Sequence, residues 1–160
     1  MARRITALIL MLVLSVATFT GCGAQQCHYE ELTFTLPKDF ASRSQEAYAE
    51  DFDFLFENGI VAIAGIRETK QALAHFGTLD TAAYTKLVIE INQLSCEPVQ
   101  TEGIWCFSYE AVSHGTPMTY ICSVYEADES FWQIQAYCAT ADFATHGNQM
   151  WELILSMDAA

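Results

Sequence analysis

Hydrophobic and polar residues alternate in several short stretches of the chain, which is the pattern of half-buried β-strands. The alternation is regular over residues 32–37, where Pro37 ends the run. Residues 51–57 and 60–66 form two further runs on either side of the pair Asn58-Gly59. An Asn-Gly pair in this position predicts a tight hairpin, with positive φ at both turn residues.

The second half of the chain predicts three more strands, joined by short polar segments into an antiparallel meander. They cover residues 103–110, 118–126 and 131–139. Helical patterns surround them. The expected helices run from Ser42 to Tyr48 behind a capping box, from Arg67 to Phe76 with Gly77 closing, over 81–91 behind Asp80 or Thr81, and from Asp142 towards the C-terminus.

This order of elements predicts the fold class. Strands dominate the middle of the chain, hairpins join most of them, and the helices are set apart from the strands. We therefore expect an α+β fold with an antiparallel β-sheet flanked by helices, in a single domain over residues 29–160.

The N-terminus is typical of a secretory signal. Arg3 and Arg4 precede an apolar stretch from Ile5 to about Phe19. At about fifteen residues, this stretch is shorter than the ~20 residues that a membrane-spanning helix needs. A positive start followed by a short apolar run predicts a signal peptide over residues 1–21.

The stretch Phe19-Thr20-Gly21-Cys22 resembles the lipobox of bacterial lipoproteins. In that family a diacylglyceryl group is attached to the cysteine thiol and the chain is cut before it. The resemblance implies palmitate-type lipidation at Cys22, a short tether over residues 22–28, and a protein anchored at the extracytoplasmic face of the cell membrane. The alternative is an ordinary cut after Ala24.

The chain is strongly acidic. Its net charge is −13, and removal of Arg3 and Arg4 with the signal peptide makes it −15. Such a surface repels phosphate backbones, which argues against nucleic acid as a partner.

Three stretches resemble the PsbP-like family, whose members include a photosystem II extrinsic protein, a Ran-binding nuclear protein and bacterial lipoproteins. They are Phe34–Phe40, the pair Phe131-Trp132, and the terminal helix ending at Ser156. The resemblance covers Leu32 to Met157 and implies an α/β/α sandwich. Its members act as binding or assembly subunits, so the resemblance assigns no catalytic residue here.

Five cysteines remain beside Cys22: Cys27, Cys96, Cys106, Cys122 and Cys138. We expect Phe107 opposite Cys122, which turns Cys106 to the other face of the sheet. In the next hairpin we expect Cys122 opposite Ile134 and Cys138 opposite Met118, too far apart to bridge. The strand cysteines are then buried thiols. A one-residue slip would instead permit a Cys106–Cys122 disulfide.

The sequence lacks common motifs of redox, metal-binding and hydrolytic sites. The chain has no Cys-x-x-Cys, His-Glu-x-x-His or Gly-x-Ser-x-Gly motif. Asp142 and His146 lie four residues apart on one predicted helix, but two potential ligands do not make a zinc site. The stretch Ser113-His114-Gly115 is predicted to be a turn. We expect no cofactor and no metal.

The aromatic residues of the meander are expected mainly in the core, with a groove at the sheet's end as the alternative. The hypothesis is a membrane-anchored, non-catalytic binding or assembly subunit with an unidentified protein or small-molecule partner. The alternative is a small cell-surface hydrolase or thiol-dependent enzyme.

Overall fold

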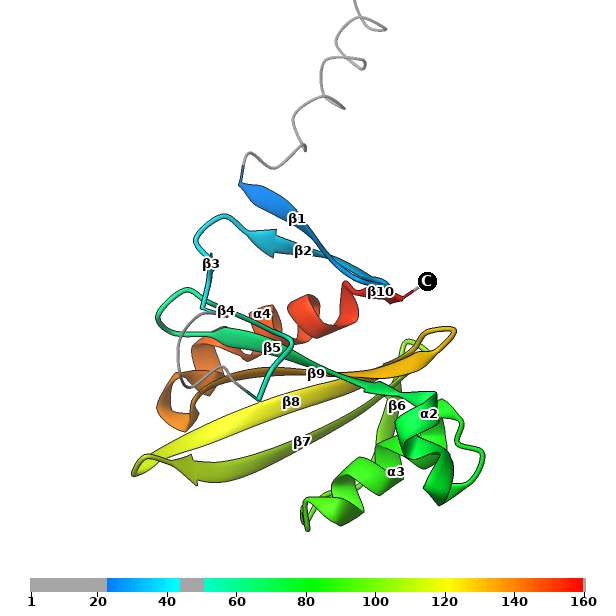
Figure 1. Cartoon of the computed structure of the whole chain (residues 1–160). Coiled ribbons are helices and arrows are strands. Elements are labelled where there is room, and N and C mark those ends of the chain that lie inside the picture. The colour runs from blue at the N-terminus through cyan, green and yellow to red at the C-terminus, as the bar shows by residue number, and fades with distance from the viewer. Residues whose placement is uncertain (1–22, 44–50, 160) are drawn as a thin grey trace, which may run out of the picture.

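The computed structural model describes residues 23–43 and 51–159, and these residues form three layers (Figure 1). The middle layer is a seven-stranded sheet in the order β3-β4-β5-β9-β8-β7-β6. Helix α4 and a small sheet, in the order β1-β2-β10, cover one face. Helices α2 and α3 cover part of the other face. The described strand pairs are antiparallel, so the predicted α+β fold is confirmed.

The strands are β1 (Ala24–Tyr29), β2 (Leu32–Pro37), β3 (Ala41–Ser42), β4 (Phe54–Glu57), β5 (Ala62–Thr69), β6 (Val99–Thr101), β7 (Ile104–Ser113), β8 (Thr116–Glu126), β9 (Ser130–Ala139) and β10 (Asp158–Ala159). The helices are α2 (Lys70–Leu73), α3 (Thr81–Ile91) and α4 (Phe143–Leu155), with short 3₁₀ helices over Ala74–Phe76 and Thr140–Asp142. Residues 44–48 of the predicted helix over 42–48 lie outside the described residues, and Ser42, its expected cap, belongs instead to β3, where it pairs with Phe56.

Alternation along β7, β8 and β9 divides the core between the two faces of the main sheet. On the α4 side, Trp132 and Ile134 of β9 pack with Met150 and Ile154 of α4, and all four are fully buried. On the α3 side, Phe107 and Cys122 pack against that helix. The predicted meander is therefore confirmed, with an apolar core on both faces.

The hairpin around Asn58-Gly59 forms, but its turn differs from the prediction. Glu57 pairs with Ala62, so four residues join the strands instead of two. The side chain of Asn58 accepts hydrogen bonds from the backbone N–H groups of Ile60 and Val61, at 3.1 and 2.9 Å. Because this side chain stabilises the turn, only Gly59 of the pair takes positive φ, at 89°.

The helix expected over 67–76 begins later than predicted. Residues 67–69 continue β5 and pair with β9, up to Thr69 opposite Ser130. The side chain of Thr69 then accepts from Ala72 N and caps α2. Gly77, at φ 90°, closes the segment as predicted.

The segment expected to be a tether contains a strand. Ala24–Tyr29 forms β1 and pairs along its whole length with β2. Only Gly23 separates Cys22 from this strand, and Cys22 itself lies outside the described residues. Within the described ranges, no helix has the length and apolar character needed to cross a membrane.

The cysteine register is correct in one hairpin and wrong in the next. Phe107 lies opposite Cys122 as predicted, and Cys106 faces the other side. Cys122, however, lies opposite Gln135 instead of Ile134, and Cys138 lies opposite Thr119 instead of Met118.

The β8–β9 connection explains this one-residue error. Glu126 pairs with Phe131, and Ala127 N donates to Ser130 O, so an even number of residues closes the turn. Cys122 and Cys138 therefore face opposite sides of the sheet. The five cysteines of the described chain are free, and Cys106, Cys122 and Cys138 are buried, which confirms the prediction of buried thiols.

Arg67 on β5 fastens the β1–β2 turn to the main sheet. Its guanidinium group forms ion pairs with Glu30 at 2.8 Å and with Glu31 at 2.6 Å. Glu31 also accepts a hydrogen bond from Trp132 Nε1, at 3.2 Å. The hydrogen bond from Arg67, supported by that from Trp132, lowers the pKa of Glu31 to about 2.

Candidate functional site

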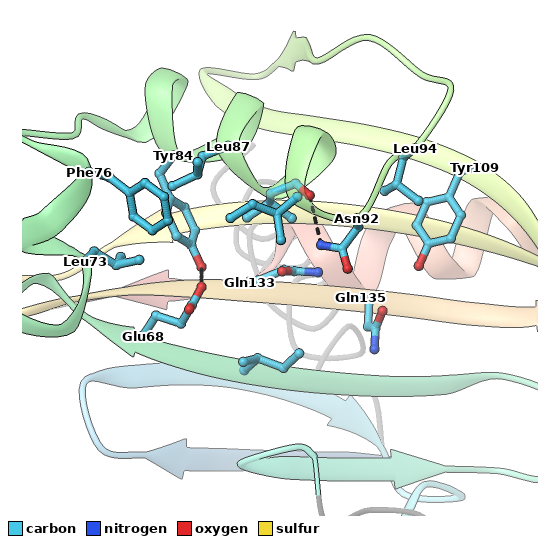
Figure 2. A pocket seen from close by; sticks show the side chains of 13 residues that line it. Glu68, Leu73, Phe76, Tyr84, Leu87, Asn92, Leu94, Tyr109, Gln133 and Gln135 are labelled. Atoms are coloured by element: carbon cyan, nitrogen blue, oxygen red, sulfur yellow. Dashed lines mark hydrogen bonds between the residues drawn. The ribbon is translucent and has the colours of Figure 1, made fainter.

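A cleft of about 380 Å³ lies between α3 and the sheet (Figure 2). Its upper side in the figure is formed by the helical segment from α2 to just beyond α3, and its floor by β5, β7 and β9. This volume falls in the range of small-ligand pockets. The cleft is therefore the candidate binding site.

The helical wall of the cleft is mostly apolar. It consists of Leu73, Phe76, Leu87, Val88, Ile91 and Leu94, together with Tyr84 and with Asn92, whose side chain donates to Val88 O at 2.8 Å. Asp80 caps α3 by accepting from Ala83 N at 2.7 Å, and Leu94 N donates to Ile89 O beyond the helix end. Phe76 and Ile91 stand at the rim, 44% and 57% exposed. The wall therefore offers apolar surface to a molecule that enters from solvent.

The floor of the cleft is polar, because two glutamines alternate along β9 on the face towards α3. Gln133 is half-buried, and Gln135 is only 7% exposed. Neither amide hydrogen-bonds to another described residue. The Gln135 amide is not among the fully buried, unpaired atoms of the described residues, so its donors and acceptor remain accessible from the cleft.

Tyr84 and Glu68 close one end of the cleft. The Tyr84 hydroxyl on α3 donates to the Glu68 carboxylate on β5 (Figure 2). The Tyr84 ring stacks on Phe131, with ring centroids 4.5 Å apart. Burial, and then the bond to Glu68, raise the pKa of Tyr84 well above its usual value, so this phenol remains protonated.

A row of tyrosines continues the floor beyond the glutamines. Tyr109, Tyr120 and Tyr137 lie side by side on β7, β8 and β9. The rings of Tyr109 and Tyr120 are 4.8 Å apart and nearly parallel. Both predictions for the aromatic residues therefore hold in part: Phe131 and Trp132 are core, whereas Tyr109 lines the cleft.

The cleft carries no positive charge. Of its described lining residues, Glu68 is the only acidic one, and lysine, arginine, histidine and cysteine are absent. Burial raises the pKa of Tyr109, so its hydroxyl also stays neutral. The site can exchange hydrogen bonds with a neutral or cationic ligand and gives no ion-pair partner to an anion.

The residues singled out from the sequence lie elsewhere. His114 and Gly115 both take positive φ in the β7–β8 turn, which confirms that Ser113-His114-Gly115 is a turn. Asp142 precedes α4 without a side-chain capping bond. Within the described residues no group of three or more His, Cys, Asp and Glu is placed to hold a metal ion.

A second hollow, of about 420 Å³, lies between the small sheet and α4. Its lining includes Leu36, Pro37 and Leu153. No polar side chain that lines it belongs to the buried polar residues of the described chain. The cleft under α3 is therefore the stronger candidate.

The fold of this chain is similar to the folds of several proteins of known structure. Cyanobacterial PsbP (CyanoP) from Synechocystis sp. PCC 6803 matches with a TM-score of 0.59 over 90% of this chain and 96% of that chain, at 14% identity. The chain has the PsbP-like fold. The resemblance noted in the sequence, and the α/β/α arrangement that it implies, are confirmed.

Two further structures are similar. A protein from Bacteroides thetaiotaomicron matches the PsbP-like fold of this chain with a TM-score of 0.57 at 12% identity, over 86% of this chain and about half (48%) of that one. LpqN, involved in cell envelope biogenesis of Mycobacterium tuberculosis, matches with a TM-score of 0.47 at 11% identity, over 84% and 88% of the two chains. No protein-family model and no curated protein matches the sequence.

Proposed function

We propose that the protein is a non-catalytic binding or assembly subunit, held at the extracytoplasmic face of the membrane by a lipid on Cys22, and that the cleft under α3 is its binding site. Gln135 carries the proposal. Its side chain is more than nine-tenths buried, lines the cleft and lacks a hydrogen-bond partner among the described residues.

The free amide of Gln135 favours this assignment. Its polar atoms are not among the fully buried, unpaired side-chain atoms of the described residues, where Ser123 Oγ stands alone, so they remain accessible from the cleft. A ligand can therefore hydrogen-bond to the donors and the acceptor of this amide. The glutamine is therefore better suited to binding than to stability.

The buried thiols of the sheet, which do not line the cleft, and the two phenols that do line it support binding over catalysis. Burial raises the pKa of Cys106 to about 11 and raises that of Cys122, so neither thiol ionises readily near neutral pH. The two phenols of the cleft are held protonated in the same way. None of these groups is poised as a nucleophile or a general base.

The geometry also suits an anchored protein. The first described strand, β1, belongs to the small sheet, and α2 and α3 lie on the opposite side of the main sheet (Figure 1). A single residue, Gly23, joins β1 to Cys22. A lipid on Cys22 would hold the small sheet near the bilayer and leave the cleft directed away from it.

Anchorage is tested by metabolic labelling with palmitate. We expect the wild-type chain to take up the label and to remain in the membrane fraction. The Cys22→Ala chain should not take up the label and should leave the membrane fraction. Cys27→Ala is the matched control and should keep both. Unchanged membrane retention of Cys22→Ala would contradict the lipid anchor.

Binding in the cleft is tested by photo-crosslinking in the intact envelope. A photo-activatable phenylalanine at Ile91, on the rim, should form one dominant adduct, and the same probe at Val112, 72% exposed on the β7–β8 hairpin, should not. Gln135→Leu should remove the Ile91 adduct, and Gln149→Leu on α4 should leave it. Equal adducts at both positions, or an adduct indifferent to Gln135→Leu, would contradict the site.

A further inference from the structure

The geometry points to an extended peptide segment as the ligand of the cleft. We propose that the segment has apolar side chains and no acidic residues, and that it lies along β9 under α3. This inference rests on the proposed function and specifies the partner of the same site. Three features of the described residues support it: the spacing of the glutamines, the apolar wall and the charge.

The spacing of Gln133 and Gln135 matches an extended chain. Residues two apart on a strand are roughly 6.6–6.8 Å apart, and an extended peptide has the same repeat. Each glutamine amide carries both a donor and an acceptor, so it can pair with a neutral polar side chain of the ligand. A segment parallel to β9 can therefore present polar side chains at alternate positions, which share one face of an extended chain, to both glutamines in one register.

The opposite wall fits the apolar side chains of such a segment. The side chains at the intervening positions point to the opposite face of the extended segment, towards α3. There they meet a wall that includes Leu87, Val88 and Ile91. The exposed rim residues Phe76 and Ile91 extend this contact outside the cleft, and burying them would add binding free energy.

Charge restricts the sequence of the segment. Glu68 is the single charged group in the described lining, and the whole chain carries a net charge of −13. An aspartate or glutamate of the ligand would lose its hydration without gaining an ion pair. Lysine or arginine outside the contact would instead be attracted by the acidic surface.

A neutral sugar matches the floor but not the wall. Its hydroxyl groups would pair with the glutamine amides, yet on the other side they would face a wall on which Asn92 is the one amide among mainly aliphatic side chains. The Tyr109 ring, already stacked on Tyr120, directs its hydroxyl end towards the β9 glutamines (Figure 2). The peptide satisfies both sides of the cleft.

The test is a selection of random seven-residue peptides, displayed on phage, against the full chain in detergent. We expect enriched sequences with apolar residues at alternate positions and without aspartate or glutamate. One enriched peptide, synthesised with both ends blocked, is then titrated by fluorescence anisotropy. A second peptide, with its middle polar residue changed to glutamate, should bind at least tenfold more weakly.

Matched glutamine variants test whether the peptide contacts the two glutamines on the floor of the cleft. Gln133→Leu and Gln135→Leu should each weaken the binding of the blocked peptide at least tenfold. Gln149→Leu, on the far side of the sheet, should leave the peptide's affinity within twofold of the wild-type value. Gln133 and Gln149 are both half-buried and without a hydrogen bond to another described residue, which makes them a close pair. Near-ultraviolet circular dichroism confirms that each variant is folded.

The outcomes separate this inference from the function on which it rests. Enrichment of acidic peptides, or an affinity unchanged by Gln133→Leu, overturns the inference. Failure to enrich any peptide, combined with a Gln135-dependent crosslink at Ile91, overturns the peptide ligand and leaves the binding site in place. Failure of both experiments overturns the proposed function as well.

Discussion

The hydroxyl of Tyr84 on α3 donates a hydrogen bond to the carboxylate of Glu68 on β5. This bond links the helix to the sheet at one end of the cleft, and the stacked rings of Tyr84 and Phe131 lie beside it. The helix is thereby fixed at one end. The rest of the gap between helix and sheet, over Gln133 and Gln135, stays open.

Tyr84→Phe should destabilise the protein by about 1–2 kcal/mol, because Glu68 loses its donor while the ring stack remains. The folded pKa of Tyr84 is raised, so its contribution is complete below about pH 10, its usual pKa, and is lost as the pH rises further. Denaturant titrations at several pH values measure the free energy of unfolding of the wild type and of the Tyr84→Phe variant. Their stabilities should converge at alkaline pH, and a constant difference would contradict the bond.

Glu31→Gln should lower the free energy of unfolding by about 1 kcal/mol at neutral pH, because Arg67 and Trp132 lose a charged acceptor. The folded pKa of Glu31, about 2, lies below its ordinary value of 4.5. The wild-type advantage is therefore complete above about pH 4.5 and disappears as the pH falls towards 2. Denaturant titrations across this range measure it.

Glu30→Gln is the control for that experiment. Glu30 is the neighbouring residue and also pairs with Arg67, but its side chain is 57% exposed and solvent screens the interaction. Its substitution should cost clearly less than that of Glu31. Equal losses from the two variants would show that the lowered pKa of Glu31 does not reflect a specific contact.

The buried thiols should react slowly. Cys106, Cys122 and Cys138 are fully buried, and burial raises the pKa of each. In the folded protein a thiol reagent should modify Cys27 and Cys96 first, and unfolding should release the other three without reductant. Mass spectrometry of the labelled protein identifies the sites. Fast labelling of a strand cysteine near neutral pH would support the thiol-enzyme alternative.

Most of the main sheet could be predicted from its alternating pattern, including the pairing of Phe107 with Cys122. The errors arose where a few atoms decide the geometry. The side chain of Asn58 lengthened one turn, and the bond from Ala127 N to Ser130 O shifted the β8–β9 register by one residue. Strand β1 was missed because its residues, AQQCHY, are mostly polar and carry little hydrophobic pattern.

The candidate site could be predicted less well than the fold. One signal was present: Gln133 and Gln135 occupy alternate positions of a central strand whose face a helix was expected to cover. Polar residues in that pattern on a buried face suggest a lined cleft. Where α3 ends relative to β9 decides how much of that face stays open, and sequence periodicity does not fix that position.

The most direct test of the central claim is the accessibility of the cleft in the intact envelope. Starting from a chain with Cys27 and Cys96 changed to serine, Ile91→Cys and Val112→Cys are labelled with a maleimide, in the envelope and after purification. The account predicts that Ile91→Cys labels at least fivefold more slowly in the envelope, while Val112→Cys labels at the same rate in both. Equal rates for Ile91→Cys in the envelope and in the purified protein would contradict an occupied cleft.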